Sequence, residues 1–230
     1  MSAAGERGTP SQALASADLP PPGPPAAGLP AAPDLPAYQV ARRQRIIDAA
    51  RALLEERDYE QIQVRDVANA AHFSVGTVYR YFSSKDHLYA AVLHAWGSRF
   101  GDVSRGPRGS DPLQRLEIRM RKVLESFEKR PRFFRVLMLL LGSTDPNAIA
   151  LLRQFRESIQ GLVQADLAEL DPEGAADDAV LIWAVLSNLL TRTTFHGAPM
   201  ADAHRINDRF TEMLRLRFST QAPAKDPAQR

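Results

Sequence analysis

The sequence contains no cysteine and no long run of apolar residues. Without cysteine the chain can form no disulfide, no thiolate metal site and no cysteine nucleophile. A membrane-spanning helix needs about 20 consecutive apolar residues. The two most apolar stretches, Val136–Leu141 and Ala179–Leu186, are much shorter and are typical of buried helices. These absences predict a cytoplasmic protein without a membrane partner.

The signatures of an enzyme are also missing. Catalysis would need a nucleophile beside a base, paired carboxylates or a metal cluster, but no phosphate-binding loop and no G-x-S-x-G motif occurs. The five histidines are scattered, at His72, His87, His94, His196 and His204. Only His87 and His94 share a predicted helix, and they lack the glutamate of a metalloprotease motif. We expect no catalytic residue, metal ion or cofactor, and an enzyme is the disfavoured alternative.

Proline is concentrated near the beginning of the sequence, where nine of the 17 prolines lie in residues 1–36 among alanine and glycine. Because this segment has few large apolar side chains to bury, it cannot offset the entropy lost on ordering. It also lacks the basic start and apolar run of a signal peptide. We expect residues 1–36 to be a disordered arm and residues 220–230 a disordered tail.

The net charge of +2 does not by itself indicate a nucleic-acid partner. The position of the charges is more informative, because Arg42, Arg43 and Arg45 lie in a stretch, Ala37–Ile47, that contains no acidic residue. A short basic run at a helix start is usually a solvated face. It indicates DNA binding only where a DNA-reading element follows.

Helical periodicity runs through the chain after Pro36, and no alternating strand pattern is found. The prolines at 112, 131, 146 and 199 stand at or near helix starts, where a missing amide is tolerated. The stretch Gly101–Pro112, rich in glycine, proline and serine, predicts a linker. The expected helices are 38–57, 64–71, 75–82, 84–99, 112–129, 132–142, 146–169, 176–196 and 200–218.

The second and third of these helices are separated by a turn of only three residues, 72–74. This spacing is the outline of a helix-turn-helix, whose second helix enters the major groove of DNA. Ser74 is well placed to cap that helix by accepting from its first backbone amides.

Helical spacing assigns two faces to residues 75–82. Val75, Val78 and Phe82 recur at steps of three and four residues and are expected to pack on the first two helices. At about 100° per residue, the opposite face carries Gly76, Thr77, Arg80 and Tyr81, with Tyr79 on the flank. A glycine within a helix costs about 1 kcal/mol against alanine. That cost makes sense if the backbone must come close to the wall of a groove.

The outward side chains suit DNA. Thr77 can hydrogen-bond a base or contact a thymine methyl group, and Arg80 can donate to guanine or to phosphate. The hydroxyls of Tyr79 and Tyr81 can reach phosphate oxygens. The alternative for an isolated helix of this length is that the tyrosines are half-buried and the arginine only solvates the surface.

The next helix has a basic start. Ser83 and Asp86 have the spacing of an acidic capping box. Between them, the ammonium of Lys85 can face phosphate together with the N-terminus of the helix.

The run VRDVANAAHFSVGTVYRYFSSKDHL resembles the DNA-binding segment of TetR-family regulators, and the upstream run IIDAARALLEERDYEQIQV resembles their first helix and turn. The family pattern is I-x-x-V/I-A-x-x-A, a small or polar residue, then G-T/S-L/V-Y-x-Y/H-F and K-x-x-L. The matching residues here are Val64, Val67, Ala68, Ala71, Ser74, Gly76, Thr77, Val78, Tyr79, Tyr81, Phe82, Lys85 and Leu88. Two residues depart from the pattern: Asp58 stands where glycine is common, and Phe73 where valine is.

The resemblance implies an all-α fold, with an N-terminal three-helix helix-turn-helix DNA-binding domain at 37–90 and a C-terminal helical effector-binding and dimerisation domain at 91–219. It implies that Thr77, Tyr79, Tyr81 and Lys85 contact DNA. With the residues argued above, the expected DNA-binding set is Arg42, Arg43, Arg45, Ser74, Gly76, Thr77, Tyr79, Arg80, Tyr81 and Lys85.

The resemblance further implies that the last two helices, Ala176–His196 and Met200–Phe218, form the four-helix bundle of a homodimer. The first of them carries more apolar residues than one packing face requires. A surplus apolar face fits a dimer contact, although a central buried helix would have the same composition.

Members of the family usually bind a small effector among the helices after the linker. The candidate lining residues are Trp96, Phe100, Phe127, Phe134, Met138, Phe155 and Trp183, with Asn188 as a polar anchor. For each of them plain core packing is the alternative. Few lone charges lie on the apolar faces, which favours a bulky apolar ligand over a sugar or a metal.

The segments DPLQRL, RPRFFRVLM and LIWAVLSNLL resemble, in layout, actinobacterial TetR-like repressors of steroid or cholesterol catabolism, whose effectors are coenzyme A thioesters. The sequence therefore predicts a homodimeric repressor that binds double-stranded DNA at a palindromic operator and is released by a small effector. The alternative is an architectural DNA-binding protein without a ligand. A small molecule that loosens DNA binding distinguishes the two.

Overall fold

The computed structural model describes residues 36–98 and 111–221, and the regular structure in these two ranges consists of nine α-helices and one 3-10 turn, without a strand. The prediction of an all-α fold is confirmed. The predicted arm, tail and linker lie outside the described residues, apart from Pro36, the start of the tail, and Asp111 and Pro112 at the end of the linker. No helix within the described ranges is long and apolar enough to cross a membrane.

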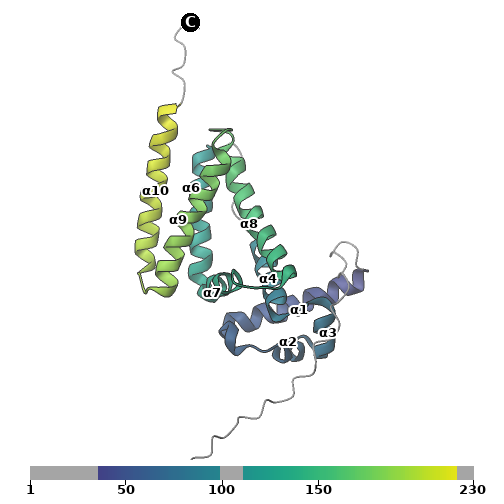
Figure 1. Cartoon of the computed structure of the whole chain (residues 1–230). Helices are drawn as coiled ribbons and strands as arrows, with labels where there is room; N and C mark the ends of the chain where they lie inside the picture. The colour runs from purple at the N-terminus through teal and green to yellow at the C-terminus, as the bar shows by residue number, and fades with distance from the viewer. Residues whose placement is uncertain (1–35, 99–110, 222–230) are drawn as a thin grey trace, which may run out of the picture.

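The N-terminal part forms a group of helices at one end of the molecule, with the short α2 and α3 beside the longer α1 (Figure 1). Its elements are α1 (Ala37–Glu56), the 3-10 turn η2 (Tyr59–Gln61), α2 (Val64–Ala71), α3 (Val75–Tyr81) and α4 (Lys85–Gly97). The short helices α2 and α3 begin where polar groups accept from backbone amides that have no helical partner. Asp66 accepts from the Gln63 amide at 2.9 Å, and the Ser74 hydroxyl accepts from the Thr77 amide at 3.2 Å.

The cap of α4 differs from the prediction. Ser84, with extended backbone angles, is the N-cap and accepts from the His87 amide at 3.0 Å. The predicted cap, Ser83, instead donates its hydroxyl to Asp145, a residue 62 positions further along the chain. A partner so distant in sequence has no local signal, and this is why the pattern placed the cap one residue too early.

The C-terminal part consists of α6 (Pro112–Lys129), α7 (Pro131–Leu140), α8 (Pro146–Leu167), α9 (Ala175–Phe195) and α10 (Met200–Gln221). The first three begin with proline, as predicted. α9 and α10 lie side by side with α6 next to both (Figure 1). The first and last residues of all five helices lie within three residues of the prediction, because strong 3.6-residue periodicity and proline starts are local signals.

α4 connects the two parts. It packs against α1 on one side and against α7 and α8 on the other, and the run of residues from His87 to Leu93 is buried throughout. The predicted domain boundary at residue 90 therefore falls inside a continuous helix. A displacement of α8 relative to α1 is therefore passed on through this helix, because close-packed interiors transmit strain.

Gly97, the last residue of α4, lies directly against α8. A Cβ atom at this position would lie 2.2 Å from Cε2 and 2.5 Å from Cδ2 of Phe155, distances that atoms do not reach without displacement. Phe155 is itself buried, with 2% of its surface exposed. The glycine therefore permits an aromatic ring of α8 to lie against the backbone of α4.

We predict that Gly97→Ala lowers the free energy of unfolding by about 1–3 kcal/mol, the usual effect of overpacking a dense core. Phe155→Leu in the same chain should recover part of this loss, because the smaller side chain leaves room for the methyl group. Urea unfolding of the two single variants and the double variant measures the coupling. Strictly additive effects would contradict the close approach.

Candidate DNA interface, dimer face and effector core

Helix α3 has one buried and one exposed face. Val78 and Phe82, each with 1% of their surface exposed, anchor it on α1 and α2. Gly76, Tyr79 and Arg80 are exposed, as predicted. Thr77 is half-buried and its hydroxyl lies 2.9 Å from that of Ser74, so both side chains help to begin the helix. The polar part of the exposed face is thus one phenol and one guanidinium, beside a glycine.

Two residues of α3 do not follow the predicted faces. Val75, expected to be buried, has 38% of its surface exposed, and Tyr81, expected to face outward, is partly buried against the core. α3 has only seven residues. Its first residue lies at the edge of the domain, and its last lies where the chain turns into α4, so regular periodicity fails at both ends.

Gly76 has no steric role inside the protein. A Cβ atom placed there would meet only the Ser74 hydroxyl oxygen, at an ordinary 3.9 Å, and the backbone angle is not one that glycine alone adopts. Glycine nevertheless destabilises a helix by about 1 kcal/mol relative to alanine. Packing among the described residues therefore gives no reason for a glycine at this position.

The three arginines at the start of α1 make different contacts. The guanidinium of Arg43 lies 5.1 Å from the centre of the Phe82 ring, and burial lowers its pKa. Arg45 lies 5.0 Å from the Phe73 ring and donates to the Ala71 carbonyl at 3.4 Å. Both arginines therefore hold α1 against the helix-turn-helix. Arg42 and Arg45 are exposed and Arg43 is half-buried, so the three side chains are not equally placed for the phosphate contacts that the sequence predicts.

Lys85 also turns inward. Its ammonium donates to the Tyr59 carbonyl and lies 3.8 Å from the centre of the Tyr59 ring. Burial lowers its pKa, against the opposite effect of Glu60, Asp86 and Asp66. The ammonium does not project from the helix start, contrary to the sequence expectation, because the carbonyl of Tyr59 provides a closer acceptor.

A group of polar side chains joins the start of α4 to the loop before α8. The hydroxyls of Ser83 and Ser84 donate to Oδ2 of Asp145 at 2.7 and 2.5 Å. The Ser143 hydroxyl donates to Asp86 at 2.6 Å. We call these five residues the α4 latch. Only four residues lie between Tyr79 of α3 and Ser84, so the latch ties the exposed helix directly to the C-terminal part.

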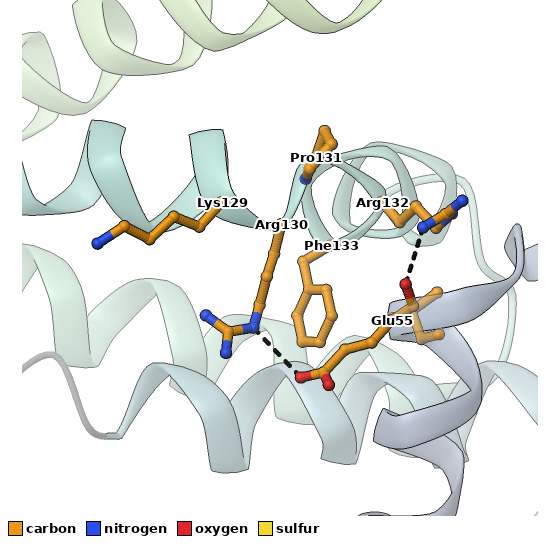
Figure 2. Close-up of a pocket in the computed structure, with 7 residues that line it drawn as sticks. Glu55, Lys129, Arg130, Pro131, Arg132 and Phe133 are labelled. Carbon is orange, nitrogen blue, oxygen red and sulfur yellow. Dashed lines mark hydrogen bonds and ion pairs between the residues drawn. The ribbon is translucent and has the colours of Figure 1, made fainter.

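A second connection lies at the corner between α6 and α7 (Figure 2). Arg130 pairs with the Glu55 carboxylate at 3.2 Å, and Arg132 donates to the Glu55 carbonyl at 2.8 Å and to Asp58 at 3.0 Å. These contacts border an open pocket of about 290 Å³ that Lys129 also lines. Asp58, which departs from the TetR-family glycine, thus serves as an acceptor between the two parts of the chain.

The predicted effector residues do not form one group. Trp96, Phe127 and Phe134 belong to a buried aromatic cluster, with ring centres 4.9 Å apart for Trp96 and Phe127 and 5.4 Å apart for Phe127 and Phe134. Phe155 is buried at Gly97, and Met138 is partly buried beside the core. Phe100 lies outside the described residues.

Trp183 lies elsewhere, in a narrow apolar slot between α6, α8 and α9. The slot is lined by Met120 and Val123 of α6, Ile159 and Val163 of α8, and Ile182 and Trp183 of α9. Its internal space is about 10 Å³, room for about one water molecule. Arg119 also lines it, a charged residue that the search for apolar periodicity missed.

Apolar side chains are exposed along one face of α9 and α10. Val180, Leu181, Met213 and Leu216 have 54%, 59%, 62% and 67% of their surfaces exposed. A groove of about 540 Å³ runs between the two helices, and Asn188 lines it. Asn188 is exposed and does not lie with the other predicted effector residues. The sequence grouped Asn188 with the core because helical periodicity alone does not distinguish a face that packs in the core from a face exposed on the surface.

Comparison with known proteins places this architecture. The family "Bacterial regulatory proteins, tetR family" matches residues 46–92. The HTH-type transcriptional repressor KstR of Mycobacterium tuberculosis is 31% identical over 190 residues, which cover 81% of this chain and 84% of KstR. The chain belongs to the TetR family. KstR of Rhodococcus jostii is 29% identical over 170 residues, covering 73% of this chain and 80% of the relative.

Solved structures of TetR-family regulators share the fold. A TetR transcriptional regulator from Rhodococcus sp. RHA1 superimposes with a TM-score of 0.64, at 23% identity, covering 79% of this chain and 98% of that one. FadR from Bacillus subtilis, in complex with stearoyl-CoA, has a TM-score of 0.58 at 18% identity and covers 74% and 96%. The TetR-family resemblance and that to actinobacterial repressors of steroid or cholesterol catabolism are confirmed. The chain is a transcriptional repressor of this family, and its relatives are regulators, not enzymes.

The α4 latch predicts a pH effect on stability. Burial alone would raise the pKa of Asp145, but hydrogen bonds from Ser84, Ser83 and the amides of Asn147 and Ala148 outweigh burial and hold the pKa below its ordinary value. A carboxylate with a lowered pKa in the folded state stabilises the fold at pH values above the ordinary aspartate range. This stabilisation is lost as the pH falls through the folded-state pKa. Asp145→Asn should therefore cost about 1–2 kcal/mol at pH 7, because the neutral amide accepts the serine hydroxyls without the charge that strengthens these hydrogen bonds.

The measurement is urea unfolding of both proteins between pH 7 and pH 3. The difference between wild type and variant should shrink towards the acid end of this range, where Asp145 begins to take up a proton. A difference independent of pH would assign the loss to packing and not to the carboxylate.

Proposed function

We propose that this repressor acts in the cytoplasm as a homodimer, holds a palindromic operator with the two α3 helices, and releases it when a bulky apolar effector enters the C-terminal helices. The observation that carries the proposal is that the exposed face of α3, where a glycine has no internal reason, is tied through the α4 latch to a closed apolar core. The exposed face of α3 and the helices that enclose the slot are thereby mechanically connected.

The contacts with DNA follow from the exposed face. Gly76 lets the backbone approach the groove wall, Arg80 donates to guanine or phosphate, and Tyr79 reaches phosphate. Thr77 contacts a base at the start of the helix. Arg42 adds a phosphate contact from α1, whereas Arg43 and Arg45 hold the helix-turn-helix in place. Lys85 contributes to DNA binding indirectly, because its ammonium fixes η2 against α4 through Tyr59.

We predict that Gly76→Ala separates folding from DNA binding. The free protein should become more stable by up to about 1 kcal/mol, because the methyl group meets nothing closer than 3.9 Å. Affinity for an operator selected from random DNA should fall at least tenfold, because the methyl group stands where the backbone approaches the groove. Fluorescence anisotropy with labelled DNA measures the second effect.

The matched control is Gly161→Ala in α8, where a Cβ atom would meet nothing within 4 Å. It should stabilise the protein to a similar extent and leave operator affinity unchanged. If the Gly76→Ala and Gly161→Ala variants bound the operator with equal affinity, the proposal that DNA approaches the backbone at Gly76 would be wrong.

The dimer is proposed from the apolar face of α9 and α10. An exposed apolar surface of this extent is unusual on a monomer, and the same face of a second copy is complementary to it under two-fold symmetry. Pairing the two helices with their symmetry mates would produce a four-helix bundle, in keeping with the TetR-family resemblance.

Leu181→Glu should weaken the dimer at least 100-fold, because symmetry places two unpaired carboxylates in one apolar contact. Ile149→Glu is the control, since Ile149 is also exposed, at 41%, but lies on α8. Sedimentation velocity compares the two variants. A Leu181→Glu protein that remains dimeric at the wild-type concentration would place the interface elsewhere.

For the effector we propose a lipid or steroid coenzyme A thioester. This choice is supported by the similarity to KstR and by the stearoyl-CoA that FadR binds on the same fold. Most of the side chains that line the slot are aliphatic or aromatic, which also suits such a ligand. The slot is closed, so an occupant must part α6, α8 and α9. The constitutive architectural alternative predicts instead that no small molecule changes operator affinity.

A further inference from the structure

A buried ion pair closes the apolar slot between α6 and α8. Arg119 donates to Oδ2 of Asp166 from Nε at 3.1 Å and from Nη2 at 2.9 Å. The two side chains are only 7% and 9% exposed. Arg119 lines the slot directly, so a charged group stands among side chains that are otherwise almost all apolar.

This pair is not explained by stability alone. Moving two charges out of water costs several kcal/mol per ion, and apolar residues of similar volume often hold helices together as well or better. The same helices already bury Met120, Val123, Ile159 and Val163 against one another. Recognition of a ligand therefore explains a guanidinium at this position better than bracing of the helices does.

Asp166 can give up Arg119 without becoming an unpaired buried charge. Arg115 donates from Nε to Oδ1 of Asp166 at 2.9 Å and also pairs with Glu169 at 2.5 Å. If an anion replaced Asp166 as the acceptor for Arg119, Arg115 would still hold the Asp166 carboxylate. The arrangement thus permits an exchange in which every charge keeps a partner.

The apolar residues continue from Arg119 along α6. Val123 and Phe127 follow on the same helix, and Phe127 lies about 12 Å further along at 1.5 Å per residue. Phe127 contacts Trp96 near the end of α4, with ring centres 4.9 Å apart. A ligand with its head at Arg119 would therefore direct its apolar body towards the helix that positions α3.

We propose that Arg119 binds the anionic head group of an amphiphilic effector, a carboxylate or a phosphate, in exchange for Asp166, while the apolar body of the effector parts α6, α8 and α9. This deepens the proposed function and rests on it. Releasing Arg119 from Asp166 removes one of the two arginine contacts that Asp166 makes with α6, and α8 can then shift against α4 while Arg115 holds Asp166.

The test is calorimetric titration of the full chain with three probes below their micellar concentrations: oleate, oleyl alcohol and oleoyl-CoA. Oleate and oleyl alcohol have the same chain and differ in the charge of the head group. Oleate or oleoyl-CoA should bind about ten- to a hundredfold more tightly than oleyl alcohol, the range of a hydrogen bond to a charged group. Binding of oleoyl-CoA but not of oleate would identify phosphate as the head group.

The double variant Arg119→Met/Asp166→Leu removes both charges and should bind the anionic probe and the alcohol equally. The control Arg121→Met/Asp208→Leu removes an exposed pair, joined at 3.2 Å between α6 and α10, and should keep the wild-type preference. If the buried double variant does not fold, as judged by circular dichroism, Arg119→Gln replaces it, because Arg115 still holds Asp166. Arg119→Gln should also lose the preference.

Three results would overturn the inference: equal binding of alcohol and anions by the wild type, a preference that survives removal of Arg119, or no binding of any probe. A different result would show that the proposed function fails. A probe that binds through Arg119 yet leaves operator affinity unchanged supports the head-group site and contradicts ligand-controlled release.

Discussion

The packing of α4 against α8 is the constraint on which the rest of the structure depends. At one end, Gly97 lets the Phe155 ring lie on the backbone of α4. At the other, the serines before α4 donate to Asp145 at the start of α8. Because α4 is fixed to α8 at both ends and α3 lies only a few residues before α4, the orientation of α3 depends on the position of α8. The arginine contacts at Glu55 and Asp58 fix α1 to the α6–α7 corner in the same way.

The closed slot gives this constraint its functional meaning. A space of about 10 Å³ between α6, α8 and α9 cannot hold a lipid, so binding requires the helices to separate. A ligand shifts an equilibrium only by the difference in its affinity for the two states. An effector that binds only the open slot therefore favours whichever position of α8 the opening imposes, and α4 carries that position to α3. The charged pair at the end of the slot makes the opening depend on the chemistry of the ligand.

Much of this architecture could be predicted from the sequence, because its signals are local. Helix limits followed from periodicity and proline starts, and the helix-turn-helix followed from three short elements with a capping serine at Ser74. Contacts between distant segments could not be predicted. Arg43 and Arg45 bind rings that come about 30 to 40 residues later, and Lys85 binds a carbonyl 26 residues earlier. Arg119 was missed because a buried charge within an apolar face carries no periodic signal, and Asn188 was grouped with the core because a contact face has the same periodicity.

The central claim is that occupancy of the C-terminal helices and operator binding by α3 are one linked equilibrium. The most direct measurement is the affinity of oleoyl-CoA for the free protein and for the protein saturated with operator DNA, together with the affinity of the operator with and without oleoyl-CoA. Linkage requires the two ratios to be equal, and we predict a ratio of about 100, which corresponds to about 2.7 kcal/mol of coupling. Oleoyl-CoA that binds the free and the operator-bound protein with the same affinity would contradict the account.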